Sequence, residues 1–294
     1  MTAIKRPYPT AAAVVRKNSK PPVTLGAIAR HIVLLLAAAI ALSPGYFMFT
    51  TAFKSQEEYI FNKIGVPSQV VFDNFRAAVV DNPFFQWMAN SAILAIGAVM
   101  ISTSVAALAA FAIARMRFPG RGFLLSLSTS LMVIPPVVMI VPLFVLYAQI
   151  GLMSTYHGAI LIYAGLITPF SVFLLVSFFR TIPTEVIEAA LIDGASPLGV
   201  LVRVVLPLSG PPLVTLFVVN ALYVWNDLLI ALIFLPRDEM RTLMVGISVF
   251  QGRYNNQIPL TMAGMILASA PMLILYILFQ RYFIRGLVAG ALKG

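Results

Sequence analysis

The amino-acid sequence predicts an all-α integral membrane protein with six transmembrane helices. Apolar residues make up 60% of its 294 residues and charged residues only 10%, whereas a soluble domain carries roughly a quarter charged residues. The mean hydropathy is +0.95. The chain contains no Cys, which excludes disulfides, thiolate metal sites and cysteine nucleophiles.

Six stretches are apolar over about the 20 residues that a helix needs to cross a bilayer. They lie near residues 31–53, 87–114, 122–148, 159–179, 211–235 and 259–280. The basic segment before the first stretch is similar to the start of a signal peptide, but the apolar run from Ile32 is long for one and lacks a clear cleavage site. We therefore expect a retained first helix. The predicted organisation is an N-terminal segment 1–30, a membrane domain 31–284 and a tail 285–294.

Lys and Arg are distributed unequally between the predicted loops. With the N-terminus inside, the inner segments hold 14 of the 20 Lys and Arg residues and the outer segments hold 6. Cytoplasmic loops carry the excess of positive charge in membrane proteins, so both termini are expected in the cytoplasm of an inner-membrane protein. The formal net charge of +10 has the same explanation and requires no nucleic-acid partner.

Proline and glycine interrupt several of the predicted spans. The third contains Pro135, Pro136 and Pro142, and the fourth and sixth also contain Gly and Pro. Pro removes a backbone donor and bends a helix, so kinked helices suit a packed bundle that changes shape. Pro and Gly are also frequent in membrane helices generally, and this feature favours a transporter only slightly.

One carboxylate, Asp227, lies within a predicted span, near the outer end of the fifth. An intramembrane carboxylate is by default a functional candidate, and here lining of a pathway and a structural hydrogen-bonding role are both open. An ion-driven carrier normally uses more such groups. The energy for any transport is therefore expected to come from outside this chain.

The sequence lacks the motifs of nucleotide hydrolysis and of common enzymes. A phosphate-binding P-loop needs Gly-Lys followed by Ser or Thr, and no Gly-Lys dipeptide occurs. The two histidines, His31 and His157, do not have the spacing of a zinc-protease helix, and no Ser lies in a Gly-x-Ser-x-Gly elbow. We expect no metal, no cofactor and no enzymatic activity in this chain.

A polar interruption at residues 181–209 separates the fourth and fifth spans and predicts two short helices. Pro183 suits the first turn of one helix, and Gly194 can adopt the left-handed conformation that ends it. The Ser-Pro pair at 196–197 suits the cap and first turn of a second helix, which Pro207 is expected to stop. Each helix is too short to span a membrane.

The first of these short helices has an apolar side. A short apolar helix presented to the cytoplasm can dock into a groove on a partner protein. The alternative is an amphipathic helix lying on the membrane surface, but the stretch from Arg180 onward carries three carboxylates and only two cations, Arg180 and Arg203. Docking is therefore favoured. The expected apolar side consists of Val186, Ile187, Ala189, Ala190 and Leu191.

The loop carries the pattern Glu188-Ala189-Ala190, Asp193-Gly194-Ala195 and Leu206-Pro207. This spaced pattern resembles the EAA loop of the permease subunits of binding-protein-dependent ABC importers. Other segments, from about residue 31 to the end, resemble the carbohydrate-uptake subfamily and in particular its six-helix, maltose-type second permease. They are FKSQEEY, RMRFPGR, IPPVVMIVPLF, FFRTIPTEVIEAALIDGAS, WNDLL and QRYFIRGLVAGALKG.

The resemblance implies the type I permease fold of ABC importers and a function in ATP-driven sugar or oligosaccharide import. It implies as partners a related second permease, two ATPase subunits that bind ATP and Mg²⁺, and a periplasmic or lipid-anchored sugar-binding protein. The C-terminal residues Gly290, Lys293 and Gly294 match a segment that reaches toward the ATPase dimer. The loop itself would be the coupling helix, seated in a cleft of one ATPase, with the motif positions Glu188, Ala189, Ala190, Asp193, Gly194, Ala195 and Pro207.

The substrate would pass along the third to fifth spans. Aromatic and amide side chains there offer stacking faces and hydrogen bonds, although helix packing explains the same residues equally well. The subfamily takes up disaccharides, longer oligosaccharides, acidic ones included, and glycerol phosphates. The rival classes are an ion-gradient-driven secondary transporter that depends on Asp227 and a membrane scaffold that moves no solute. The candidate pathway residues are Tyr163, Asn220, Tyr223, Trp225 and Asn226.

Overall fold

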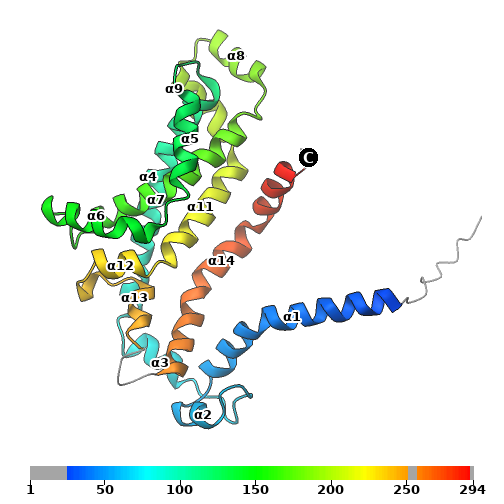
Figure 1. Ribbon diagram of the computed structural model, residues 1–294, viewed down its shortest axis with the longest axis vertical. Helices are drawn as coiled ribbons and strands as arrows, with labels where there is room; N and C mark the ends of the chain where they lie inside the picture. Colours follow the sequence, from blue (N-terminus) through cyan, green and yellow to red (C-terminus); the bar gives the residue numbers. More distant parts are fainter. Residues whose placement is uncertain (1–24, 251–256, 292–294) are drawn as a thin grey trace, which may run out of the picture. The chain divides into compact units, whose positions relative to one another are not determined.

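The structure is a computed structural model that describes the backbone of residues 25–250 and 257–291, with side chains for residues 28–250 and 257–280. Within these ranges all regular elements are helical (Figure 1). The contacts between residues divide the chain into two units, residues 1–46 and 47–294.

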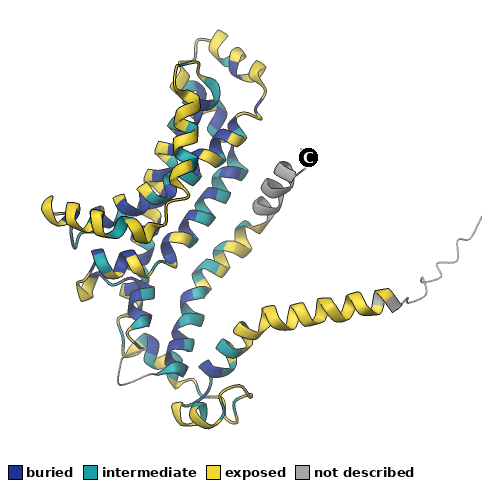
Figure 2. Ribbon diagram, viewed as in Figure 1, coloured by how far each residue is buried: buried dark blue, intermediate teal, exposed yellow. Residues whose placement is uncertain are grey.

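The described part of the smaller unit is the first portion of α1 (Leu25–Ala52). Its apolar side chains are exposed all round the helix, and Leu35 and Ile40 have exposed fractions of 69% and 73% (Figure 2). A helix that is apolar on every side is suited to lipid or to a protein surface within the membrane. The segment Ile28–Ala52 has 25 residues and is long enough to span a bilayer.

The larger unit is built around α4 (Phe84–Arg115) and α7 (Tyr156–Phe179), which pack along each other, with α11 (Gly210–Trp225) against both and α14 (Ile258–Ala291) against α11. Shorter elements connect these helices. They are α2 (Gln56–Phe61), α3 (Asp73–Val80), α5 (Arg121–Leu131), α6 (Pro136–Gln149), α8 (Thr184–Ile192), α9 (Pro197–Val200), the π-helical turn η1 (Leu201–Val205), α10 (Leu206–Leu208), α12 (Leu229–Phe234), the 3₁₀ turn η2 (Asp238–Met240) and α13 (Leu243–Ser248).

Among the described residues, four helices are long and apolar enough to cross a membrane, and two bent pairs raise the number to six if each pair counts as one span. The four are α1, α4, α7 and α14. The pair α5 and α6 is bent by 99°, and the segment Pro197–Leu208 is bent by 80° against α11. The predicted fifth span, 211–235, is not one rod, because α11 ends at Trp225 and α12 begins at Leu229.

The bend between α5 and α6 lies at two consecutive prolines. Pro135 has extended backbone angles, φ −64° and ψ 131°, and Pro136 begins α6. Neither residue has an amide hydrogen for a helix ladder, and a residue before Pro is pushed out of the helical region. The prolines at 142, 169 and 271 lie inside continuous helices, so among these prolines only the 135–136 pair produces a complete break.

Buried residues lie along the central helices of the larger unit (Figure 2). Their side chains form three clusters. The first joins the middle of α4 to α7, α11 and α12; the second joins the end of α4 to the end of α7, α8 and α9; the third joins α3, the start of α4, α13 and α14. Small polar residues link the central helices. Ser171 on α7 lies 3.2 Å from the Ser102 hydroxyl on α4 and accepts a 2.9 Å bond from Asn220 on α11, a typical contact between membrane helices.

The segment between α1 and α4 is fixed by side chains that bond to the backbone. Buried Lys54 donates to the Asn62 carbonyl at 2.7 Å, and Asn74 donates to the carbonyls of Ala52 and Lys54 at 2.8 Å each. The backbone N–H of Ser68 donates to the Glu58 carboxylate at 2.6 Å and lowers the pKa of that group. This connection is therefore a folded part of the larger unit.

Candidate functional site

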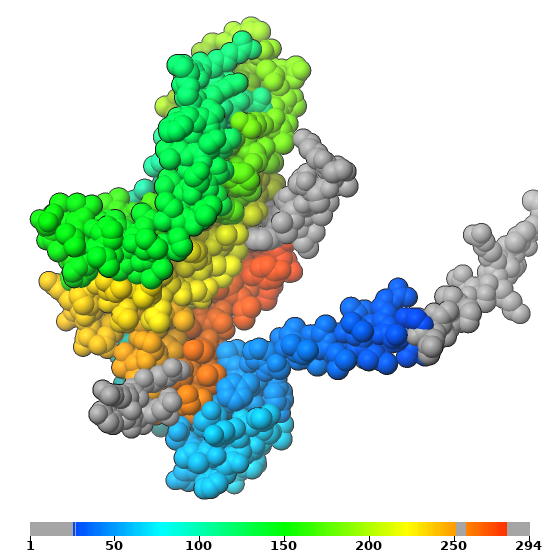
Figure 3. All heavy atoms as spheres, viewed as in Figure 1, coloured from blue at the N-terminus to red at the C-terminus, as the bar shows by residue number. Residues whose placement is uncertain are grey.

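The polar interruption folds into a helical hairpin at one end of the larger unit (Figure 1), and its atoms lie at the same end in Figure 3. Helix α8 ends in a Schellman motif, in which the Gly194 N–H bonds to the Leu191 carbonyl and the Ala195 N–H to the Ala190 carbonyl, both at 3.0 Å. Gly194 has φ +84°, so the predicted left-handed glycine is confirmed. Its conformation sets the direction in which the second helix leaves.

The second helix begins as predicted and ends within one residue of the predicted stop. Ser196 caps it by accepting a 3.2 Å bond from the Gly199 N–H, and Pro197 is its first residue. The helical segment ends at Leu208, one residue beyond Pro207, so the predicted stop is confirmed to within one residue. The π-helical turn ends two residues before Pro207 and includes the residue four positions before it, whose carbonyl the proline ring would meet in a regular α-helix.

The start of α8 also differs slightly from the sequence prediction. Pro183, expected in the first turn, has extended angles of φ −57° and ψ 137° and stands as the cap residue before Thr184. The restricted φ of proline serves either position, and a shift of one residue leaves the direction of α8 unchanged.

The motif residues lie on two sides of the hairpin. Glu188, Ala189, Asp193 and Gly194 are exposed, as is Pro207. Ala190 and Ala195 are partly buried and pack against the second cluster. The expected apolar side of α8 is divided in the same way, since Ile187 is buried, whereas Val186, Leu191 and the neighbouring Ile192 are exposed, Ile192 by 86%.

One residue that the sequence did not single out joins this hairpin to the bundle. Arg115, the last residue of α4, donates to the backbone carbonyls of Phe179 and Ile182, with the Nε–Phe179 O bond measuring 2.9 Å. Its Nη1 also lies 3.4 Å from the Thr184 hydroxyl. The sequence signals for this residue are its position as the first cation after a long apolar run and its place at the start of RMRFPGR, and neither indicates its partners.

Two of the candidate pathway residues hold helices together. The Tyr163 hydroxyl on α7 is fully buried and donates to Asp227 at 2.7 Å. Buried Trp225 donates from its indole nitrogen to the Ala268 carbonyl of α14 at 3.1 Å. Asn226 is exposed and bonds to the Leu222 carbonyl of its own helix at 2.9 Å.

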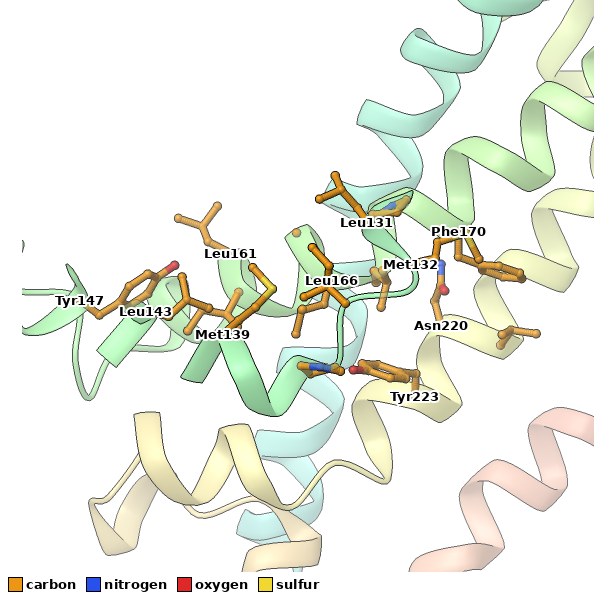
Figure 4. A pocket seen from close by; sticks show the side chains of 17 residues that line it. Leu131, Met132, Met139, Leu143, Tyr147, Leu161, Leu166, Phe170, Asn220 and Tyr223 are labelled. Carbon is orange, nitrogen blue, oxygen red and sulfur yellow. The ribbon is translucent and has the colours of Figure 1, made fainter. Parts of the chain in front are cut away.

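The structure brings the other two candidates, Asn220 and Tyr223, to one cavity of about 500 Å³ (Figure 4). The cavity lies between the α5–α6 bend, α7 and α11, and its walls are mainly apolar. Among the described residues that line it there is no charged side chain. Such a cavity can hold a sugar ring against apolar faces and offers an amide and two phenols, those of Tyr147 and Tyr223, for hydrogen bonding.

Asp227 lies at the break between α11 and α12. Besides Tyr163, its carboxylate accepts bonds from the backbone N–H groups of Ile230 at 2.9 Å and Ala231 at 3.2 Å. These N–H groups lie in the first turn of α12 and have no acceptor within the helix, so a carboxylate beside them is stabilising. Of the two interpretations left open by the sequence, these contacts favour the structural one.

The C-terminal candidates are largely outside the described part of the chain. The backbone of α14 includes Gly290 and ends at Ala291, beyond the predicted domain boundary at 284. The surroundings of Gly290, and the residues Lys293 and Gly294 altogether, lie outside the described residues.

Comparisons with known proteins identify the family of the chain. The model of the binding-protein-dependent transport system inner membrane component matches residues 99–288. Protein ORF2 of Caldicellulosiruptor sp. (strain Rt8B.4), named for an ABC transporter permease, is 39% identical, with 90% of this chain and 96% of that protein covered. The melibiose/raffinose/stachyose import permease protein MelC of Bacillus subtilis (strain 168) is 34% identical, with 90% and 97% covered.

A solved structure has the same fold. It is a chain of a bacterial ABC transporter involved in the import of the acidic polysaccharide alginate, with a TM-score of 0.75 and 23% identity over 87% of this chain and 95% of that one. The apolar helices agree with a membrane protein, and the family model matches more than half of the sequence. The chain is a multi-pass membrane protein and belongs to the family of binding-protein-dependent transport system inner membrane components.

Proposed function

We propose that this chain is the permease subunit of an ATP-driven importer of a sugar or an oligosaccharide. The observation that carries the proposal is the α8–α9 hairpin, which presents Glu188, Asp193 and the apolar Ile192 outside the core of a membrane protein of this family. Exposed apolar and acidic side chains on a short helix suit insertion into a groove of a partner. In this proposal the partner is an ATPase subunit.

The permease performs no covalent chemistry in this mechanism. Two partner ATPase subunits bind ATP and Mg²⁺, and their closure moves the hairpin. A second, related permease completes the membrane path, and a sugar-binding protein delivers the substrate from outside. The hairpin and both termini lie in the cytoplasm, in agreement with the excess of Lys and Arg in the inner segments.

The substrate class is proposed from the relatives and from the cavity. MelC is named for import of melibiose, raffinose and stachyose, which are neutral sugars. The cavity beside Asn220 and Tyr223 has hydrogen-bonding groups and no charge among its described lining residues, which suits hydroxyl groups. An acidic oligosaccharide stays within the proposed class.

The decisive experiment is purification of the tagged chain from its native membrane with identification of the proteins that copurify. We expect a related permease and an ATPase with a P-loop. Glu188→Lys reverses an exposed charge on α8 and is expected to remove the ATPase from the complex or to uncouple its ATP hydrolysis from transport. Glu185→Lys makes the same change in the first turn of the same helix, outside the motif, and is the matched control.

Two results would contradict the proposal. If the wild-type chain is recovered without any ATPase and accumulates solute under an ion gradient, the secondary-transporter alternative is correct. If Glu188→Lys imports sugar as well as Glu185→Lys does, the hairpin is not the contact with the ATPase.

A further inference from the structure

The end of α4 is bonded to the joint between α7 and α8 through a single side chain. Arg115 donates to the carbonyl of Phe179, the last residue of α7, and to the carbonyl of Ile182 in the linker. It also approaches the hydroxyl of Thr184, the first residue of α8. One guanidinium thus contacts the helix, the linker and the start of the hairpin.

The chemistry of this contact suits arginine in particular. The last carbonyls of an α-helix have no partners within the helix and lie at the negative end of its dipole. A guanidinium carries several donors in a rigid plane and can bind two carbonyl groups at once, whereas an ammonium is a point charge. Replacement of Arg115 by Lys therefore keeps the positive charge but loses the rigid plane of donors that binds two carbonyl groups at once.

Packing around the joint keeps it compact. Phe179 is fully buried, and Ile182 and Ile187 are exposed by only 6% and 7%. They belong to one cluster with Ala110 and Phe111 of α4. The linker between α7 and α8 has only residues 180–183, so α8 has little freedom to move independently once this cluster and Arg115 hold its base.

We propose that Arg115 is a positioning residue that locks the base of α8 to α4 and α7, so that movement of the hairpin is passed to both helices together. This inference rests on the proposed role of the hairpin in coupling to an ATPase. It assigns to Arg115 a mechanical function that is separate from contact with the partner, because its guanidinium is directed at the chain's own carbonyls.

The first test measures the joint directly and needs no partner protein. Because the chain has no Cys, spin labels can be placed by two substitutions, Met100→Cys on α4 and Glu185→Cys on α8, both at exposed positions. We expect a narrow distance distribution in the wild-type background and loss of that narrow maximum with Arg115→Ala. A control pair on α4 and α7, Met100→Cys and Ser177→Cys, should keep its distribution. Arg117→Ala, which removes a nearby exposed arginine, should change neither pair.

The second test uses the assembled importer and measures the sugar imported per ATP hydrolysed. With Arg115→Ala we expect this ratio to fall about tenfold, a typical size for energetic coupling between two sites. Arg115→Lys should give an intermediate ratio and Arg117→Ala an unchanged one. A residue with a merely structural role would lower the amount of complex but leave this ratio unaltered.

The outcomes separate this inference from the proposed function. The proposed role of Arg115 is overturned if the distance distribution between residues 100 and 185 is unchanged in Arg115→Ala. It is also overturned if the sugar imported per ATP hydrolysed is unchanged in that variant. If no ATPase copurifies with the wild-type chain, the proposed function fails. If no ATPase copurifies but the distance distribution between residues 100 and 185 broadens in Arg115→Ala, Arg115 holds the joint without any role in coupling. That result also overturns the inference.

Discussion

At the scale of single residues, a few polar side chains of the membrane region join helices that are distant in the sequence. Asp227 accepts from Tyr163 and from two amides of α12, and Asn220 bonds to Ser171. Within apolar surroundings, each such bond avoids the cost of an unpaired polar group. These contacts fix the ends and crossings of helices at positions that hydrophobic packing alone does not define.

Asp227→Ala is expected to destabilise the protein because it leaves the buried Tyr163 hydroxyl and two backbone amides without their partner. The expected loss is about 2 kcal/mol in the free energy of unfolding, the usual cost of such unpaired groups. Tyr163→Phe removes the hydroxyl itself and should cost about 1 kcal/mol. Thermal unfolding of the purified chain in detergent measures both changes.

Asp227→Asn distinguishes this structural role from a role in ion coupling. The amide keeps an oxygen that accepts hydrogen bonds but cannot carry the charge or release a proton. We expect transport to persist in this variant and to be insensitive to a protonophore at constant ATP. A stable Asp227→Asn protein that has lost transport would instead make Asp227 part of the pathway.

At the scale of elements, the hairpin is determined by local backbone chemistry. Gly194 has φ +84°, and a side chain at this position would meet no atom within 4 Å. The obstacle to substitution is therefore conformational and not steric contact with a neighbour. Gly194→Ala should lower the unfolding free energy by about 1 kcal/mol, the cost of left-handed backbone for a residue with a Cβ, and should reduce coupling by misdirecting the second helix.

Gly122→Ala is the matched control for this prediction. Gly122 lies in α5, has an ordinary helical φ and also has no atom within 4 Å of an added Cβ. Because Ala is the better helix former, this variant should be neutral or slightly stabilising. Equal destabilisation by both substitutions would mean that the conformation of Gly194 is not what the hairpin requires.

The elements that the sequence predicted well are those with local causes. The apolar runs indicated where the membrane helices lie, and Gly194 and Ser196 marked the turn and the cap of the hairpin, because these signals act over four or five residues. The break at Trp225 and the π-helical turn before Pro207 depend on packing and on the partners of freed backbone groups. Hydropathy contains no information about them.

The candidate site also contains features with local causes, which the sequence predicted, and features that depend on packing, which it did not. The hairpin was predicted as two short helices, whereas no structural role was predicted for Arg115, which entered only as a positive charge and as part of RMRFPGR. Its partners Phe179 and Ile182 lie 64 and 67 residues away in sequence, as does Asp227 from Tyr163 at 64 residues. Bonds between such distant residues arise from the packing of α4, α7 and α11, which a single sequence does not reveal.

At the scale of the whole molecule, much apolar surface of the larger unit is uncovered. Val133, Val138 and Val141 around the α5–α6 bend have exposed fractions of 80%, 64% and 70%. For a soluble protein such a surface would promote aggregation. In a membrane it is compatible with lipid and with the second permease of the proposed complex.

The orientation of the whole molecule gives the last prediction, and the absence of Cys makes it simple to test. We expect Lys63→Cys, in the segment between α1 and α4, to react in intact cells with a maleimide that cannot cross the membrane. Arg121→Cys, at the start of α5, should react only after the membrane is opened. Both residues are exposed in the structure, so a difference in labelling reports the side of the membrane and not burial. The reverse pattern would place the α8–α9 hairpin outside the cell, where no ATP-hydrolysing partner can reach it, and would overturn the coupling mechanism even if the fold is correct.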